Sequence, residues 1–146
     1  RLKRQLQLAE RDLPSLIADA ELRQRCQDLL AADQHYDRAI REACVILENR
    51  VRAATGADPS TVGTALMEIA FSVKSPKLCL SVHDQEQRGA MDLYRGVMAF
   101  FRNAAGHSVI DTYTQIDALR FVVMIDLLLS MVGSVVASTK PSSGTQ

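Results

Sequence analysis

A cation, an amide and an imidazole lie close together in the segment Arg102-Asn103-Ala104-Ala105-Gly106-His107. The planar guanidinium of Arg102 presents a fork of donors that fits a phosphate, and the imidazole of His107 exchanges protons near neutral pH. The amide of Asn103 can orient a ribose hydroxyl or the imidazole ring. The three residue types together suit phosphate chemistry on RNA.

The same segment also has a purely structural explanation. Basic side chains near the C-terminal end of a helix are stabilised by the helix dipole and by unpaired carbonyl groups. An arginine and a histidine separated by four residues occur by chance in many helical proteins. The spacing of Arg102 and His107 is therefore a weak signal until the rest of the chain is considered.

Two further arginines, Arg88 and Arg95, precede Arg102 at intervals of seven residues. Positions seven apart on a helix drift by only about 20°, so the three side chains are expected on one side. Such a row could follow an RNA backbone. The alternative is a charged stripe that only contacts solvent.

Composition restricts the classes of function. The chain has 146 residues, of which 47% are hydrophobic, as expected of one folded domain. Basic and acidic residues both number 17, so no global positive field attracts nucleic acid, and an RNA site must be local.

Cysteines and histidines show no metal-ligand spacing. The odd, widely separated set of Cys26, Cys44 and Cys79 argues against a disulfide framework or a paired-cysteine zinc site, and His35 and His83 do not complete one. We therefore expect no metal, no cofactor and a reducing, cytoplasmic setting. No signal peptide is visible, and because the first residue is Arg1 and not methionine, we expect a piece of a longer protein or a trimmed chain.

One apolar run, residues 121–137, resembles a membrane segment. It is shorter than the roughly 20 residues that a spanning helix needs, and Asp126 interrupts it. We therefore expect a core helix wrapped by its neighbours and no membrane. Asp126 either pairs with an arginine such as Arg102 or faces a dimer interface, and the sequence does not decide between these.

Apolar residues recur at helical spacing along the chain. The pattern predicts helices over residues 2–13, 19–32, 36–55, 60–71, 84–105 and from 114 to about 137, with a loop over 72–82. The expected N-terminal caps are Asp19, Ser60 or Thr61, Asp84 in a capping box with Gln87, and Thr114. The expected C-terminal stops are Gly56 and Gly106.

Every predicted element is a helix, so the fold class is all-α, a compact helical bundle with an N-terminal helical extension. We divide the chain into an extension over residues 1–32, a bundle domain over 33–137 and a disordered tail over 138–146. Tyr36 and Tyr94 could stack on bases, but their helical spacing favours the core.

Three blocks between residues 33 and 136 form a recognisable pattern. They comprise residues 35–43 with 47–52, residues 63–67 with 70–72 and Pro76, and Glu86, Gly89, Leu93 and Gly96 leading into Arg102-Asn103 and His107. With these blocks the chain resembles the HEPN superfamily of small helical domains and, within it, the bacterial Ymh-type branch. Ala104 stands where that branch commonly has proline.

The resemblance implies a metal-independent endoribonuclease in which the 2′-hydroxyl of the RNA attacks the adjacent phosphate. His107 would act as general base or acid, Arg102 would hold the phosphate, and Asn103 would position the hydroxyl or the ring. Two protomers would form a homodimer with a composite site. The implied role is the effector of a bacterial defence or toxin–antitoxin system, partnered by an antitoxin or a sensor domain.

Two alternatives stay open. The chain could be a non-catalytic HEPN module that binds a nucleotide or assembles partners. It could also be a structural helical domain that oligomerises through residues 1–13.

Overall fold

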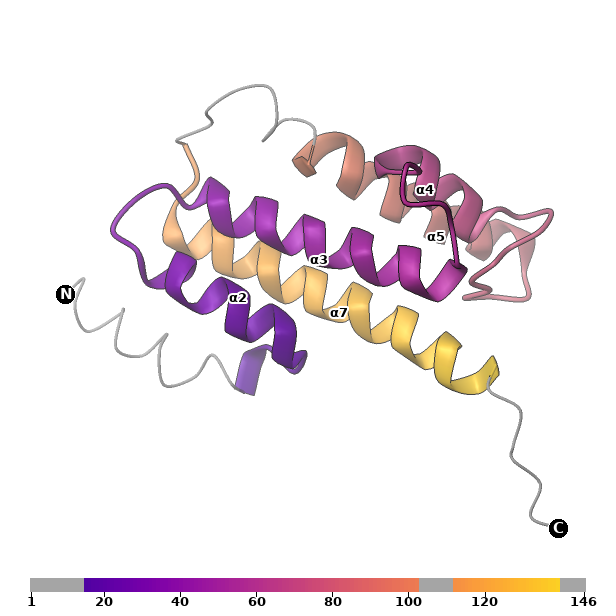
Figure 1. Ribbon diagram of the computed structural model, residues 1–146, viewed down its shortest axis with the longest axis horizontal. Helices are drawn as coiled ribbons and strands as arrows, with labels where there is room; N and C mark the ends of the chain where they lie inside the picture. The colour runs from indigo at the N-terminus through magenta and orange to yellow at the C-terminus, as the bar shows by residue number, and fades with distance from the viewer. Residues whose placement is uncertain (1–14, 103–111, 140–146) are drawn as a thin grey trace, which may run out of the picture.

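The structure of the protein is a computed structural model that describes residues 15–102 and 112–139. These residues form five α-helices and one π-helical turn, without a strand, so the predicted all-α class is confirmed for the described part of the chain (Figure 1). The elements are α2 (Ala20–Ala31), α3 (Asp37–Thr55), α4 (Gly63–Phe71), α5 (Asp84–Val97), η1 (Met98–Arg102) and α7 (Gln115–Thr139). The predicted helix over 2–13 and residues 140–146 of the predicted tail lie outside the described residues.

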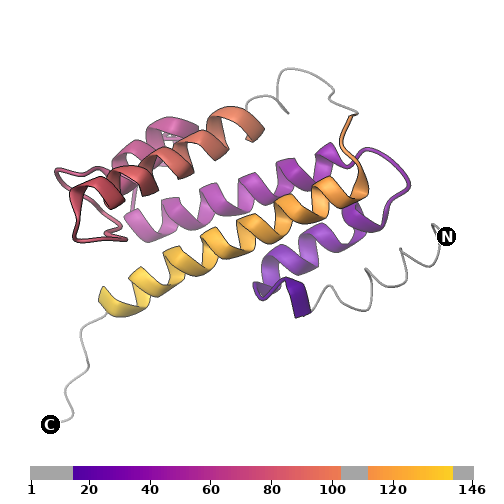
Figure 2. The ribbon, with the colours of Figure 1, turned by 180° about the vertical axis from the view of Figure 1, so that it is seen from behind.

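Helix α3 is the centre of the bundle and contacts α2, α4, η1 and α7. The long helices α3 and α7 lie side by side and run in the same direction, whereas α2 and α5 run in the opposite direction on either side of them (Figures 1 and 2). The end of α5 and the π turn therefore lie near the beginning of α3 and of α7.

The sequence of α3 explains its position. Small and aliphatic side chains recur three and four residues apart and are buried, including Ala39, Ala43 and Leu47. The helix stops at Gly56, whose φ of 66° lies in the left-handed region that glycine adopts at little cost. Both the extent and the stop of α3 agree with the prediction.

Helix α2 shares this core, because Leu22, Cys26 and Leu30 are buried with the side chains of α3 and α7. The predicted cap is confirmed, since the carboxylate of Asp19 accepts the N–H of Leu22 at 3.0 Å. Asp126 of α7 accepts the backbone N–H of Asp19 at 2.8 Å and that of Ala18 at 3.1 Å. Asp126 thus binds the chain entering α2 and not Arg102.

Helix α7 begins with a reciprocal cap. The Thr114 hydroxyl accepts the N–H of Asp117, and the Asp117 carboxylate accepts the N–H of Thr114, as the sequence predicted for Thr114. The inner side of the helix is buried, but Leu127 of the apolar run is 61% exposed. The expectation that neighbours wrap the apolar run was therefore wrong for its outer side.

By length and composition alone, residues Gln115–Val136 of α7 form a stretch that could cross a membrane, of which 33% is buried within the bundle. The helix also continues to Thr139, one residue beyond the predicted start of the tail.

The predicted caps of α4 and α5 were wrong. Helix α4 begins at Gly63 and not at residue 60, because the N–H and hydroxyl of Ser60 both bond to the carboxylate of Asp58 within a turn. In α5 the residue before the helix is His83, and Asp84 is already helical. The side chain of Gln87 does not complete a capping box.

Gln87 instead holds the loop over residues 72–82. Its buried amide nitrogen donates to the carbonyls of Phe71 and Leu78, both at 3.0 Å. Its oxygen accepts the N–H groups of Leu80 and Ser81. One side chain thereby supplies three bonds to a loop that has no helix or sheet of its own, and a fourth bond to the last residue of α4.

Candidate functional site

The helix that carries Arg102 changes its winding before it reaches that residue. The sequence predicted one α-helix to residue 105, but α5 ends at Val97 and the chain continues as the π turn η1, Met98–Arg102. A π turn holds one more residue than an α turn, so the residues after it are displaced by about one helical position, or roughly 100°. π turns of this kind occur frequently at functional sites.

The winding separates Arg102 from the other two arginines of the predicted row. Arg88 and Arg95 are both exposed on α5, and Arg95 pairs with Glu68 of α4 at 3.2 Å. Arg102 pairs with Glu48 of α3. The expected seven-residue α-helical spacing of the row was therefore wrong at Arg102, because η1 is a π turn, whereas contact of Arg88 and Arg95 with RNA stays a prediction.

Glu48 is the centre of the site. It is only 5% exposed, and its carboxylate binds groups from three elements. Its Oε2 accepts the Nε of Arg102 at 2.7 Å and the N–H of Gly63 at 3.2 Å, and its Oε1 accepts the Nη2 of Arg52 at 2.8 Å. Two guanidinium groups on one carboxylate leave one net positive charge.

Local sequence explains this convergence. Glu48 and Arg52 are four residues apart on α3, where side chains are neighbours. Gly63 has a φ of 58°, a left-handed conformation that places a residue without a side chain at the start of α4. A Cβ built on Gly63 would lie 3.9 Å from Nη1 of Arg102, so the guanidinium passes close to this backbone.

The arrangement fixes Arg102 without burying it. Its side chain is 31% exposed, compared with 18% for Arg52. The bond from Nε to Glu48 sets the direction of the guanidinium while the group keeps contact with solvent. A cation held in advance in this way can bind a phosphate oxygen and stabilise charge that develops on it.

Arg102 is the only one of the three predicted catalytic residues that the structure describes. Asn103 and His107 lie outside the described residues, between the end of η1 and the start of α7. The described part of the candidate site therefore consists of Arg102 and its partners on α3 and α4.

The sequence analysis did not assign Glu48, Arg52 or Gly63 to the site, although all three fall in the first two blocks of the resemblance. One signal could have found Glu48. Cys44, Leu47 and Val51 mark a buried stripe of α3, and position 48 falls on it. A carboxylate at an apolar position requires a buried partner.

The two buried thiols are unsuited to nucleophilic chemistry. Burial raises the pKa of Cys44 to about 12, against the opposing influence of the Arg102 charge, and burial likewise raises the pKa of Cys26 to about 12. Both thiols are therefore protonated at neutral pH. Among the residues of the described ranges, no group of three His, Cys, Asp or Glu side chains is placed to hold a metal ion.

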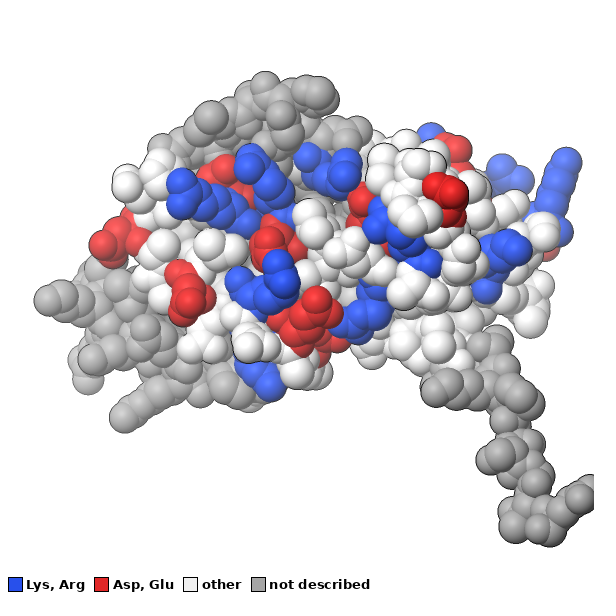
Figure 3. All heavy atoms as spheres, viewed as in Figure 1, with Lys and Arg blue, Asp and Glu red and all other residues white. Residues whose placement is uncertain are grey.

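Charges on the face that carries α3 are mixed. Figure 3 shows lysine and arginine side chains interspersed with aspartate and glutamate over α2, α3 and α4, with no large area of one sign on this face. The distribution agrees with the equal numbers of basic and acidic residues. A binding site for an anion on this face must therefore depend on particular residues and not on a broad positive area.

Comparison with known protein families gives one match. A family model described as a protein of unknown function (Hypoth_Ymh) matches residues 17–132. The chain belongs to this family. The matched region includes Glu48, Gly63, Arg102 and His107, and its start at residue 17 includes α2 as well. No curated protein and no solved structure matches the chain.

Proposed function

We propose that this Hypoth_Ymh chain is a metal-independent endoribonuclease of the HEPN type. The observation that carries the proposal is the guanidinium of Arg102, which a buried carboxylate fixes on a π turn five residues before His107. A second observation supports the proposal, because Glu48 pairs with both Arg102 and Arg52. The two arginines and one carboxylate therefore keep a net positive charge for an incoming phosphate. An arginine fully neutralised by its own carboxylate would bind an anion poorly.

The reaction uses the RNA's own nucleophile. His107 takes the proton from the 2′-hydroxyl, and the 2′-oxygen forms a bond to the adjacent phosphorus. The bond from phosphorus to the 5′-oxygen of the next nucleotide breaks, and that oxygen takes up a proton. The products are a 2′,3′-cyclic phosphate and a 5′-hydroxyl. Arg102 offsets the charge on the phosphate oxygens, and Asn103 positions the hydroxyl or the ring.

We propose further that the enzyme is a homodimer in the cytoplasm. One imidazole serves poorly as both base and acid in the same turnover, and two protomers across a two-fold axis supply two. Sedimentation analysis tests the dimer directly. The proposed biological role is the effector of a defence or toxin–antitoxin system, with an antitoxin or sensor domain as its partner.

A non-catalytic nucleotide-binding module is the second candidate. It is favoured by an apolar, aromatic cavity lined in part by Phe101, the residue before Arg102, because such cavities are typical of small-ligand sites. In this alternative Arg102 would bind a phosphate without cleavage.

Incubation of the purified protein with bacterial RNA in EDTA tests the proposal. We expect cleavage by the parent, and loss of at least about 100-fold in rate for His107→Ala, the scale of general acid–base catalysis. Arg102→Ala should fall by a similar factor. The matched control is Lys77→Ala, which removes an exposed charge from the loop over residues 72–82 and should cleave normally.

Cleavage that survives His107→Ala, or that needs a divalent metal, contradicts the proposal. Intact RNA with the parent, together with nucleotide binding that requires Arg102, supports the second candidate instead.

A further inference from the structure

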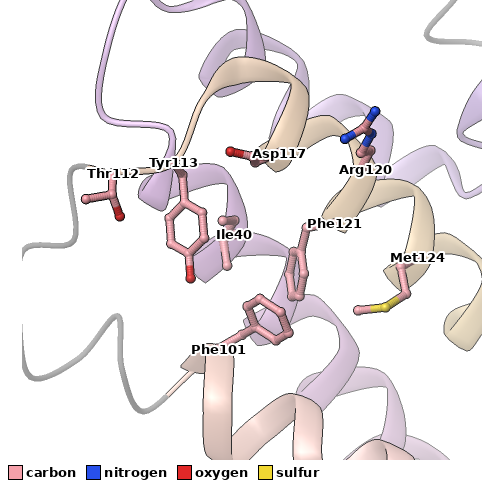
Figure 4. A pocket seen from close by; sticks show the side chains of 8 residues that line it. All are labelled: Ile40, Phe101, Thr112, Tyr113, Asp117, Arg120, Phe121 and Met124. Carbon is pink, nitrogen blue, oxygen red and sulfur yellow. The ribbon is translucent and has the colours of Figure 1, made fainter.

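A cavity of about 550 Å³ lies where η1 ends and α7 begins (Figure 4). Its size is within the range of small-ligand sites. Phe101, Tyr113 and Phe121 line it with aromatic rings, and Ile40 and Met124 add aliphatic and thioether surface. The cavity is therefore formed by side chains from η1, the approach to α7, α7 itself and α3.

The aromatic rings present surfaces for a flat ligand. The ring centroids of Phe101 and Phe121 are 4.4 Å apart, with an angle of 45° between the planes. Figure 4 shows the ring of Tyr113 on the other side of Ile40 from these two. Phe121 is 5% exposed and belongs to the core, whereas Phe101 and Tyr113 are only partly buried. Aromatic side chains with one accessible side are the usual stacking partners of unpaired bases.

Two polar groups add specificity and charge. Arg120 lines the cavity, is exposed, and its charge attracts the nearby carboxylate of Asp117. The carboxylate of Asp117 also lines it but is engaged by the N–H of Thr114 in the cap of α7. An exposed guanidinium beside aromatic rings suits a ligand that joins a planar ring to an anion.

The lining of the cavity indicates which ligand this is. It places the aromatic rings of Phe101 and Tyr113 together with the guanidinium of Arg120, and Phe101 directly precedes Arg102 in the chain. A ligand that fits this lining carries an aromatic ring and an anionic group separated by a short linker. A ribonucleotide has this composition, with ribose as the linker.

We propose that the cavity binds one unstacked nucleobase of the single-stranded RNA whose phosphate Arg102 contacts. The identity of the ligand rests on the proposed function, since RNA is the substrate there. The base would stack on Phe101 and Tyr113, and Arg120 would contact a neighbouring phosphate. The cavity then sets a preference for the base that the RNA places there.

Titration of the protein with adenosine 3′-monophosphate and, separately, with ribose 5-phosphate tests the proposal. The nucleotide should bind at least about tenfold more tightly, because stacking of a base on an aromatic side chain is worth about 1–3 kcal/mol. Phe101→Leu and Tyr113→Ala should each reduce that advantage at least about fivefold. Phe100→Leu is the matched control, since Phe100 is 67% exposed and does not line the cavity.

The proposal is overturned if the protein binds the two ligands with equal affinity. It is also overturned if both cavity variants fold normally and still bind the nucleotide more tightly than ribose 5-phosphate by the same factor as the parent. The nuclease can fail separately. If nucleotide binding depends on Phe101 and Tyr113 but RNA is not cleaved, the base-binding cavity is supported and the proposed nuclease activity is contradicted. If RNA is cleaved without metal but the nucleotide binds no more tightly than ribose 5-phosphate, the nuclease activity is supported and the base-binding cavity is contradicted.

Discussion

Replacing Glu48 by Gln should destabilise the protein more than its single-atom change suggests. The substitution keeps the shape of the side chain but removes the charge that Arg102 and Arg52 share at 2.7 and 2.8 Å. Removing one partner of a buried ion pair costs about 3–5 kcal/mol, since the other charge is left without compensation. Water reaches Arg102 and Arg52 in part, at 31% and 18% exposure, so we expect a loss of about 2–3 kcal/mol.

The assay is unfolding in urea, with the midpoint and slope compared between the parent and Glu48→Gln. For a chain of this size the same loss lowers the melting temperature by roughly 5–10 °C. The matched control is Glu68→Gln, because Glu68 pairs with Arg95 where both side chains are about half exposed. Such surface pairs contribute about 0–1 kcal/mol. If the two variants lose the same small amount of stability, Glu48 does not hold the arginines in the way described.

Three further outcomes are expected from the fold. Gly63→Ala should lower the free energy of unfolding by about 1–2 kcal/mol, since the φ of 58° at this position is unfavourable for any residue with a Cβ. The control is Gly89→Ala in α5, where the added Cβ meets no atom within 4 Å, and it should be neutral or stabilising by up to about 1 kcal/mol in the same urea assay. Gln87→Met should lower the free energy of unfolding by at least about 2 kcal/mol, because buried carbonyl and N–H groups lose their hydrogen-bond partner. The same change should increase amide hydrogen exchange over residues 72–82, and unchanged exchange would show that other contacts hold the loop. Burial alone would raise the pKa of Asp19, but the hydrogen bonds from Arg50 and from the Leu22 N–H lower this pKa below its ordinary value. The ionised carboxylate of Asp19 therefore stabilises the folded protein fully above about pH 4, and this contribution is lost as the pH falls through the lowered pKa. The stability gap between the parent and Asp19→Asn should therefore narrow on acidification, and a constant gap down to about pH 2 would show that the charge of Asp19 has no effect.

Local rules predicted the parts of the fold that depend on local interactions. The stop at Gly56 and the caps at Asp19 and Thr114 involve residues within a few positions of each other, and the structure has all three. The cap predicted at Asp84 failed because the Gln87 side chain finds better partners across the chain, in the loop over residues 72–82. A tertiary contact replaced the local one, and no spacing rule contains it.

The candidate site was predictable only in part for the same reason. The residue types and spacing of the segment around Arg102 indicated phosphate chemistry, and Arg102 is a fixed, partly exposed cation. The π turn that directs it to Glu48 has no marker in the sequence, since neither proline nor glycine interrupts residues 98–102. The role of Gly63 depends on the packing of α4 beside α3, which periodicity does not specify.

The proposed function depends above all on cleavage of RNA by its own 2′-hydroxyl without a metal. This step is tested by comparing one single-stranded RNA oligonucleotide with its fully 2′-O-methylated copy, both incubated with the parent protein in EDTA. We expect cleavage of the unmodified strand alone, with cyclic phosphate and 5′-hydroxyl ends, and no cleavage by His107→Ala. Cleavage of the methylated strand, or products with 5′-phosphate ends, would contradict the mechanism.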